Sequence, residues 1–268
     1  MSKENGFVVI DKPSGITSHD VVAKIRRVLN TKKVGHAGTL DPMATGVLVL
    51  GINDGTKFLS FITDGKKRYE ATICLGVSTV TDDKEGEILS SADASTIKDD
   101  EIRFELAKFI GRILQRPSSV SAIKVDGVRS YDRVRKGEQV ELPPREVEIY
   151  ELVVLAIRQD TKQDTKLEID IDVTCSSGTY IRAIARDLGV ALGVGGHLTA
   201  LRRTEVSPFT LEDTTPLEAP QVRPLKESLN GVLPSRLLNE DQIRELRFGR
   251  FISPSPFAGP GLAIDADD

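Results

Sequence analysis

Polar and apolar residues alternate along three segments of the chain, residues 67–77, 145–158 and 166–176. This two-residue period places apolar side chains on one face, so each segment is predicted to be a half-buried strand. A polar turn separates the last two segments. Continuous apolar runs at residues 7–10 and 47–50 predict two further short strands.

Helical spacing of apolar residues, or a capping residue ahead of such a pattern, predicts four helices, at residues 18–30, 99–111, 181–189 and 239–247. Thr17 or Ser18 offers the N-cap of the first helix. Gly111 and Gly189 are expected to end the second and third helices, because glycine readily adopts the left-handed conformation found after a helix C-terminus.

Strands and helices follow one another without regular βαβ alternation, which predicts the α+β class rather than a doubly wound parallel sheet. Asp126-Gly127 between short β-prone runs predicts a hairpin, and a short helix is expected over residues 131–137. Prolines recur after residue 215 and interrupt the chain. We therefore expect a catalytic domain at residues 1–225 and a small C-terminal region at residues 226–268.

Composition narrows the class of protein. The 268 residues are 39% hydrophobic and 28% charged, which is typical of a soluble globular protein, and no apolar run approaches a membrane span. Two cysteines exclude a disulfide framework, and three histidines exclude a histidine-rich metal site. Cys74 and Cys175 fall in predicted strands and are expected to be buried and unreactive. A cytoplasmic, metal-free protein is the expectation.

The formal net charge of −4 argues weakly against a nucleic-acid partner, but its distribution matters more. Acidic residues predominate at residues 82–101, whereas basic residues predominate at residues 112–145 and 177–204. Two basic stretches can form one positive face on an acidic chain. The charge therefore leaves RNA binding open.

A glycine-rich loop at residues 35–46 surrounds one carboxylate, Asp41. It is not a phosphate-binding P-loop, because no Gly-Lys-Ser/Thr ends it and no strand leads into it. Asp41-Pro42 could simply begin a turn. Ordered glycine-rich loops between core elements also commonly hold functional sites, so both interpretations stand on these residues alone.

Residues 36–48, His-Ala-Gly-Thr-Leu-Asp-Pro-x-Ala-Thr-Gly-x-Leu, closely resemble the signature of the TruB family, bacterial tRNA pseudouridine synthases that act on uridine 55. Ordered matches to further family motifs extend over roughly residues 7 to 210, and they lie at residues 11–18, 67–69, 121–135, 143–145, 177–189 and 197–204. Agreement of so many motifs in one order makes chance similarity very improbable.

The resemblance implies a pseudouridine synthase fold, with a mixed, largely antiparallel sheet flanked by helices. It also implies a basic RNA-binding insertion at about residues 116–150, although a charged appendage of this kind could be merely solvated. The C-terminal region at residues 226–268 is similar to the beginning of a PUA-like RNA-binding domain, and we expect it to be short or truncated. The partner implied is the T-arm and T-loop of tRNA, bound by a monomer without cofactor, metal or obligate protein partner.

The resemblance also implies roles for individual residues. Asp41 matches the catalytic aspartate, Arg182 the arginine that pairs with it, and Tyr69 the tyrosine that stacks on the flipped base. Judged by strand alternation alone, Tyr69 would be a core residue, and Arg182 an ordinary surface arginine. Residues expected to contact substrate or RNA are His36, Lys57, Tyr180, Leu201, Arg129, Arg133 and Arg202. A lone loop histidine such as His36 is otherwise usually structural.

Two other functions remain open at this point. One is a non-catalytic chaperone that binds T-loops, a role that could also accompany catalysis. The other is the catalytic subunit of a guide-RNA-dependent pseudouridine synthase, which would require partner proteins and a fuller PUA domain.

Overall fold

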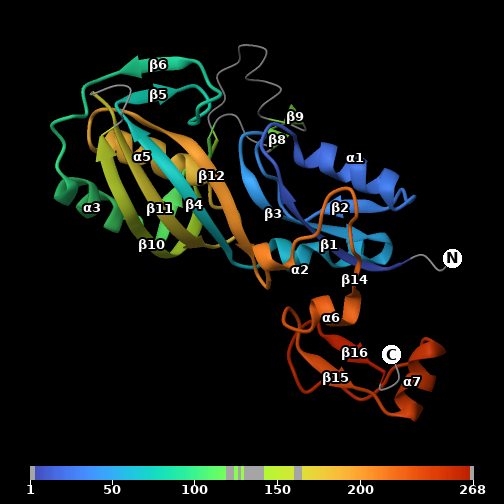
Figure 1. Ribbon diagram of the computed structural model, residues 1–268. Helices are drawn as coiled ribbons and strands as arrows, with labels where there is room; N and C mark the ends of the chain where they lie inside the picture. The colour runs from blue at the N-terminus through green and yellow to red at the C-terminus, as the bar shows by residue number, and fades with distance from the viewer. Residues whose placement is uncertain (1–3, 119–123, 126–127, 130–141, 160–164, 266–268) are drawn as a thin grey trace.

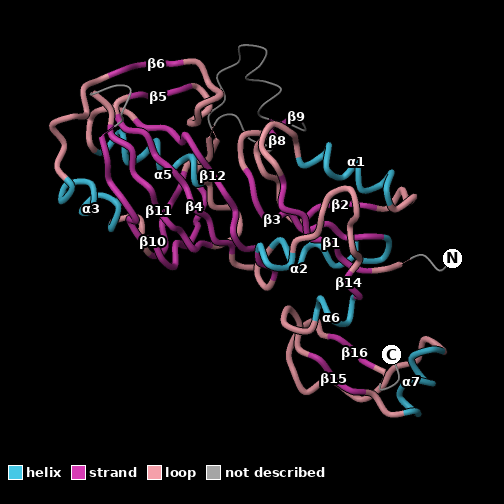
Figure 2. Tube along the Cα trace, viewed as in Figure 1, coloured by secondary structure: helices cyan, strands magenta, loops and turns pink. Residues whose placement is uncertain are grey.

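The computed structural model describes residues 4–118, 124–125, 128–129, 142–159 and 165–265. One large sheet dominates this part of the chain (Figures 1 and 2), with the strand order β14-β1-β3-β12-β4-β11-β10-β7, while β2 pairs with β3 and β13 with β12. Every pairing in this sheet is antiparallel except that of β3 with β12. The predicted mixed, largely antiparallel sheet is confirmed.

The strands of the large sheet are β1 (Gly6–Lys12), β2 (Val34–His36), β3 (Thr45–Ile52), β4 (Lys67–Leu75), β7 (Gly111–Gln115), β10 (Arg145–Gln159), β11 (Leu167–Cys175), β12 (Gly196–Val206), β13 (Phe209–Thr210) and β14 (Arg223–Pro224). Three two-stranded sheets are formed by β5 (Val77–Thr79) with β6 (Ile88–Ser91), β8 (Lys124–Val125) with β9 (Val128–Arg129), and β15 (Ser235–Leu237) with β16 (Leu262–Ile264).

The described α-helices are α1 (Ser18–Val28), α2 (Leu59–Thr63), α3 (Asp99–Ala107), α5 (Ile181–Ala191), α6 (Leu225–Leu229) and α7 (Glu240–Arg247), with 3-10 helices η1 (Asn53–Phe58) and η2 (Leu211–Asp213). The predicted first helix is confirmed, and Thr17 caps it by accepting a hydrogen bond from the Asp20 amide. None of the described helices is long and apolar enough to span a membrane.

Three buried clusters hold the sheet to its helices. The largest joins β4, β11 and β12 to α3 and α5, and Ile73, Ile169 and Leu188 in it are fully buried. A second cluster packs α1 on β1 and β3, and a third lies around Phe7 and Phe209. Burying a single large aliphatic side chain contributes about 1.5–3 kcal/mol, so these clusters dominate the stability of the fold.

The lower lobe in Figure 1 contains α6, α7, β15 and β16. The predicted short helix in this region is confirmed as α7, which begins after an Asn239 cap that accepts a hydrogen bond from the Gln242 amide. The predicted division at residue 225 falls at the first residue of α6. That division into two domains stays a prediction.

The predicted hairpin near residue 126 is confirmed in its strands, because β8 and β9 pair antiparallel through Val125 and Val128. Its turn and the helix expected over residues 131–137 lie outside the described residues. The expected end of the second helix at Gly111 is wrong. Helix α3 ends at Ala107, and Gly111 instead begins β7 with a φ of 99°.

The expected end of the third helix at Gly189 is also wrong, because packing against a distant strand explains this glycine. Helix α5 continues to Ala191, and Gly193, with a φ of 74°, follows its end. A Cβ on Gly189 would lie 2.1 Å from the amide nitrogen of Gly196. The glycine is therefore required by close packing of α5 on β12.

Replacing Gly189 with alanine should lower the free energy of unfolding by about 1–3 kcal/mol, because the added methyl group overpacks this contact. Helix propensity alone predicts the opposite sign, a gain of about 1 kcal/mol. Urea unfolding checks the prediction, and Val190→Ala on the same helix is the control, since Val190 is 71% exposed. A more stable Gly189→Ala variant would contradict the packing argument.

Candidate active site

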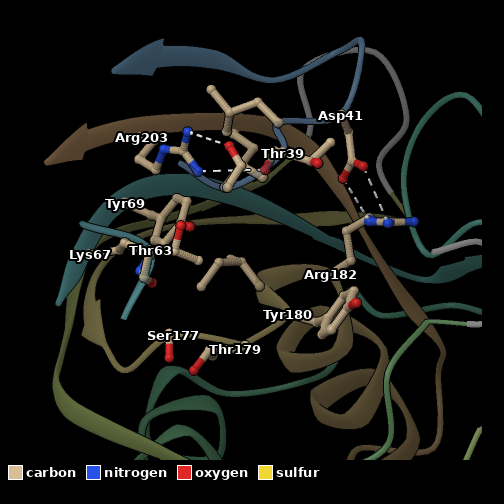
Figure 3. A pocket seen from close by; sticks show the side chains of 15 residues that line it. Thr39, Asp41, Thr63, Lys67, Tyr69, Ser177, Thr179, Tyr180, Arg182 and Arg203 are labelled. Atoms are coloured by element: carbon tan, nitrogen blue, oxygen red, sulfur yellow. Dashed lines mark hydrogen bonds and ion pairs between the residues drawn. The ribbon is translucent and has the colours of Figure 1, made fainter. Parts of the chain in front are cut away.

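A pocket of about 260 Å³ opens between the loop at residues 37–44 and the N-terminus of α5 (Figure 3). Its volume lies just below the range of about 300–1,000 Å³ usual for drug-sized ligands. Its walls combine apolar and charged side chains, among them Asp41, Tyr69, Tyr180, Arg182 and Leu201. The structure thus brings five of the expected site residues together.

The loop that bears Asp41 is held on both sides of the carboxylate. The Ser18 hydroxyl at the start of α1 donates to the Leu40 carbonyl and accepts from the Leu40 amide. The buried Lys12 ammonium donates to the carbonyls of Pro42, Pro13 and Ile16. Burial lowers the pKa of Lys12 to about 8, while nearby Asp41 acts in the opposite direction. These bonds give the loop a fixed path.

Asp41 and Arg182 both line the pocket and contact each other there, as Figure 3 shows. Arg182 Nε lies 3.0 Å from Asp41 Oδ2, and its Nη2 donates to Oδ1 at 3.4 Å. The arginine side chain is 5% exposed and the aspartate side chain 34%. A two-point contact of this kind fixes the direction of the carboxylate while leaving it accessible to a ligand.

The Arg182 guanidinium is also held by residues of the acidic segment that begins near residue 82. Arg182 Nη1 donates to the Thr81 carbonyl at 2.7 Å and lies 3.6 Å from the buried Asp83 carboxylate. One helical turn further on, Arg186 contacts Asp82 at 3.3 Å. The pKa of Asp82 is raised chiefly by burial. Two acids of the acidic segment therefore position two arginines of α5, and they do not add negative charge to the surface.

Arg203 is the most buried of the cations that line the pocket, at 1% exposure. Its Nε donates to the Val47 carbonyl at 2.8 Å, and its Nη2 donates to the Gly38 carbonyl at 3.2 Å. Tyr69 lies beside it, 7% exposed, and burial raises the pKa of its phenol. The tyrosine therefore presents an uncharged ring to the pocket.

Lys67 lines the pocket beneath Tyr69 (Figure 3). Its ammonium donates to the carbonyls of Thr63 at 2.5 Å and Gly65 at 2.7 Å. Burial, helped by the nearby Arg203 charge, lowers the pKa of Lys67 to about 8. This lysine ties the end of α2 to the pocket wall.

Tyr180 is positioned by a side-chain amide. Gln115, only 2% exposed, accepts from the Tyr180 amide at 2.8 Å and donates to the Tyr180 carbonyl at 3.0 Å. Because Tyr180 is the N-cap of α5, this double contact also fixes the start of the helix that bears Arg182.

Of the other expected residues, Lys57, Arg202 and His36 lie outside the set that lines the pocket. Lys57 is exposed in η1 and pairs with Asp54 at 2.8 Å. Arg202 pairs with Asp11 at 2.7 Å, on the opposite face of β12 from its pocket-lining neighbours. His36 ends β2, where its ring lies edge-on to His19 with centroids 5.5 Å apart. Arg129 is in β9, and Arg133 falls outside the described residues.

Lys67, Arg203 and Asp83 are site residues that the sequence reasoning missed. A signal existed for the first two. Strand side chains alternate, so Lys67 shares a face with Tyr69, and Arg203 shares a face with Leu201. Asp83 follows no comparable pattern, because a loop rather than a strand brings it to Arg182.

Neither cysteine belongs to the pocket lining. Cys74 and Cys175 are both buried, as expected, and they form no disulfide with each other. Burial raises the pKa of Cys175 to about 11, so its thiol stays protonated at neutral pH. Within the described ranges, no three His, Cys, Asp or Glu side chains gather as a metal site.

The buried Lys67 charge gives a pH-dependent contribution to stability. Between about pH 8 and the usual lysine pKa of 10.5, the unfolded chain retains a proton that folded Lys67 has lost, so the folded state gains stability as the pH rises. The free energy of unfolding of the wild type should therefore rise relative to that of Lys67→Met by about 1.4 kcal/mol per pH unit in this range. Urea unfolding at several pH values measures it.

Lys66→Met is the matched control, because Lys66 is exposed and immediately precedes Lys67, the first residue of β4. Its removal eliminates no buried charge. If the stability of Lys67→Met relative to the wild type does not change with pH, Lys67 remains charged in the folded protein.

Comparisons with known proteins show which sequences and folds this chain resembles. Residues 26–181 match the family model described as TruB family pseudouridylate synthase (N terminal domain), and residues 182–230 match the tRNA pseudouridylate synthase B C-terminal domain. The chain is 53% identical to the tRNA pseudouridine synthase B of Arthrobacter sp. (strain FB24), covering 98% of this chain and 87% of that protein. Its identity with the protein of the same name from Corynebacterium aurimucosum is 51%, covering 98% and 89%.

Two solved structures are similar in fold. One is an H/ACA RNP bound to a substrate RNA containing 2′-deoxyuridine, with a TM-score of 0.65 and 26% identity, covering 92% of this chain and 67% of that chain. The other is a Cbf5-Nop10-Gar1 complex, also with a TM-score of 0.65, at 28% identity and covering 91% and 67%. Because the first family model spans more than half of the chain and the curated relatives are so similar, the chain belongs to the TruB family of pseudouridylate synthases.

Proposed function

We propose that this chain converts uridine 55 in the T-loop of tRNA to pseudouridine, with Asp41 as the catalytic carboxylate. Relatives more than half identical to it, over nearly its whole length, are named tRNA pseudouridine synthase B. The observation that supports the role of Asp41 is its contact with the buried Arg182 at 3.0 Å, within a pocket lined by Tyr69.

The reaction explains why a pocket is needed. Pseudouridine formation breaks the bond between uracil N1 and ribose C1′ and joins C5 to C1′. No side chain reaches these atoms in a stacked base, so the uridine must flip out of the RNA. The Asp41 carboxylate, directed by Arg182, would act on the ribose or the ring without an activating base.

The other pocket residues support base binding. Tyr69 would pack its ring on the uracil, and Leu201 and Tyr180 would complete the walls. The low exposure of Tyr69, Arg182 and Leu201 restricts water, which strengthens the electrostatic contacts inside the pocket. Arg203 and Lys67 would hold the surrounding backbone, because their donors already contact carbonyl oxygens.

Residues outside the pocket would hold the folded RNA. His36, at the entrance to the loop that bears Asp41, would contribute to recognising the T-loop. Arg129, Arg133, Lys57 and Arg202 would contact the RNA elsewhere, through charge and without reading sequence. The proposal requires no partner protein, because Asp41, Arg182 and Tyr69 already meet in one pocket of this chain. We further propose that the chain acts as a monomer and that it modifies tRNA in the cytoplasm.

Tritium release from a tRNA transcript labelled at uracil C5 tests this function directly, because forming the new carbon–carbon bond expels that hydrogen. Purified wild type should release tritium without added metal or nucleotide. Asp41→Asn removes the carboxylate charge with little change of shape and should reduce the rate at least about 10³-fold. Asp93→Asn is the matched control, because Asp93 is exposed on a distant loop.

The tRNA affinity of each variant is measured in parallel. Tight binding with no release by the wild type would contradict the enzyme and favour a non-catalytic RNA chaperone. Release by both the wild type and Asp41→Asn would exclude Asp41 as the catalytic group.

A further inference from the structure

The start of helix α5 has no capping residue of the usual kind in its own sequence. Tyr180 occupies the N-cap position, where Ser, Thr, Asp or Asn is preferred. In a capping box, a Glu or Gln at the third helical position accepts a hydrogen bond from the N-cap amide, but that position holds Ala183. The helix that bears Arg182 therefore needs a group from elsewhere in the chain at its N-terminus.

Gln115, the last residue of β7, supplies this group. Its side-chain oxygen accepts from the Tyr180 amide at 2.8 Å, and its side-chain nitrogen donates to the Tyr180 carbonyl at 3.0 Å. The same carbonyl accepts from the Ala183 amide in the first turn of the helix. One buried side-chain amide thus binds both backbone groups of the N-cap residue.

Helix α5 in turn holds the end of β7. Arg186 Nη2 donates to the Arg116 carbonyl at 2.7 Å. Its other two nitrogens contact the Asp187 carboxylate at 2.8 Å and the Asp82 carboxylate at 3.3 Å, so the guanidinium has little freedom to turn. The term β7–α5 clamp is used below for these contacts between the two elements, which involve Gln115, Arg116, Tyr180 and Arg186.

The two contacts of the clamp lie on either side of Arg182 in the sequence. Tyr180 precedes Arg182 by two residues, and Figure 3 shows both side chains beside the pocket. Arg186 follows Arg182 by four residues, which places it on the same face of the helix. The segment of α5 that carries Arg182 is therefore tied to β7 at both ends.

The contact between Arg182 and Asp41 tolerates little movement of this segment. Nε lies 3.0 Å from Oδ2, but the second contact, from Nη2 to Oδ1, already measures 3.4 Å, which is long for a hydrogen bond. A displacement of α5 by about 1 Å would break the second contact and let the carboxylate rotate. Misplacement of about 1 Å can reduce a rate by about 100-fold.

Helix stability alone does not require a clamp of this kind. A local Ser or Asp at the N-cap position would stabilise the helix with a single short-range bond. A buried amide must instead have its hydrogen bonds satisfied, and Gln115, at 2% exposure, meets this need through the backbone of one residue on another element. Such a contact fixes the distance between β7 and α5, which a local cap cannot do.

We propose that Gln115 is a positioning residue for the reaction, and that Arg186 supports it by holding the end of β7. Neither side chain lines the pocket. The clamp acts through Arg182, because it keeps this arginine where its guanidinium can contact both carboxylate oxygens of Asp41. The inference therefore rests on the proposed function.

Gln115→Met tests the clamp, because methionine has a similar length and cannot replace the paired hydrogen bonds. At saturating tRNA, single-turnover tritium release should fall about 10- to 100-fold, and the affinity for tRNA should stay within about twofold of the wild type. Hydrogen exchange of the backbone amides at residues 180–184 should become faster, since the start of α5 loses its anchor.

Ile52→Val is the control for lost stability, because it opens a small cavity in a different buried cluster and should keep the wild-type rate. An equal loss of rate in Ile52→Val and Gln115→Met would overturn the proposal. So would a Gln115→Met protein with the wild-type rate and faster exchange at α5, because its contact would then serve stability alone.

Arg186→Gln tests the clamp from the other side and keeps the proposal testable if Gln115→Met does not fold, because the Arg186 side chain is 23% exposed. The rate at saturation should fall about three- to tenfold, with little change in affinity. Arg103→Gln, which removes an exposed arginine of α3, should change neither quantity. Weaker binding with an unchanged rate at saturation would assign Arg186 to RNA binding and overturn its place in the clamp.

Tritium release by the wild type separates this inference from the proposed function. If the wild type binds tRNA and releases no tritium, the function fails, and hydrogen exchange decides separately whether Gln115 orders the start of α5. If the wild type and both clamp variants release tritium at the same rate, the function stands and the clamp proposal fails.

Discussion

The two halves of the large sheet meet at a single parallel contact between β3 and β12, where Gly46 lies opposite Arg203. A Cβ on Gly46 would lie 2.1 Å from the Arg203 carbonyl oxygen, so only glycine permits this approach. The Arg203 side chain then reaches back to the carbonyls of Gly38 and Thr39. Because the loop between these points bears Asp41, the joint of the sheet also fixes the Asp41 carboxylate.

Two acidic residues near residue 82 position arginines of α5. Asp83 and Asp82 are buried against Arg182 and Arg186, so their charges are balanced by the arginines that they position. Breaking such a buried pair leaves an uncompensated charge and is strongly destabilising. The acidity of this segment is therefore partly a requirement of the pocket, where each of these two acids balances an arginine of α5.

Strands and helices were predictable wherever a local pattern determines them, as in the alternation of β4, β10 and β11 and the capped start of α1. The errors arose where a distant segment decides the local structure. Gly189 continues α5 because β12 packs against it. In the same way, strand alternation placed Tyr69 in the core, and the family resemblance alone gave it a pocket role. Lys57 lies exposed in η1 and does not line the pocket, and its contact with substrate or RNA stays a prediction.

The electrostatic contacts of the molecule fall into two regimes. In the pocket, Arg182 is 5% exposed and contacts Asp41 over 3.0 Å, so salt screens this pair weakly. The cations at the end of α1, such as Lys32 and Lys33, are open to solvent, where the screening length is about 8 Å at physiological salt. Ionic strength therefore affects these exposed cations more than the contact that orients the Asp41 carboxylate.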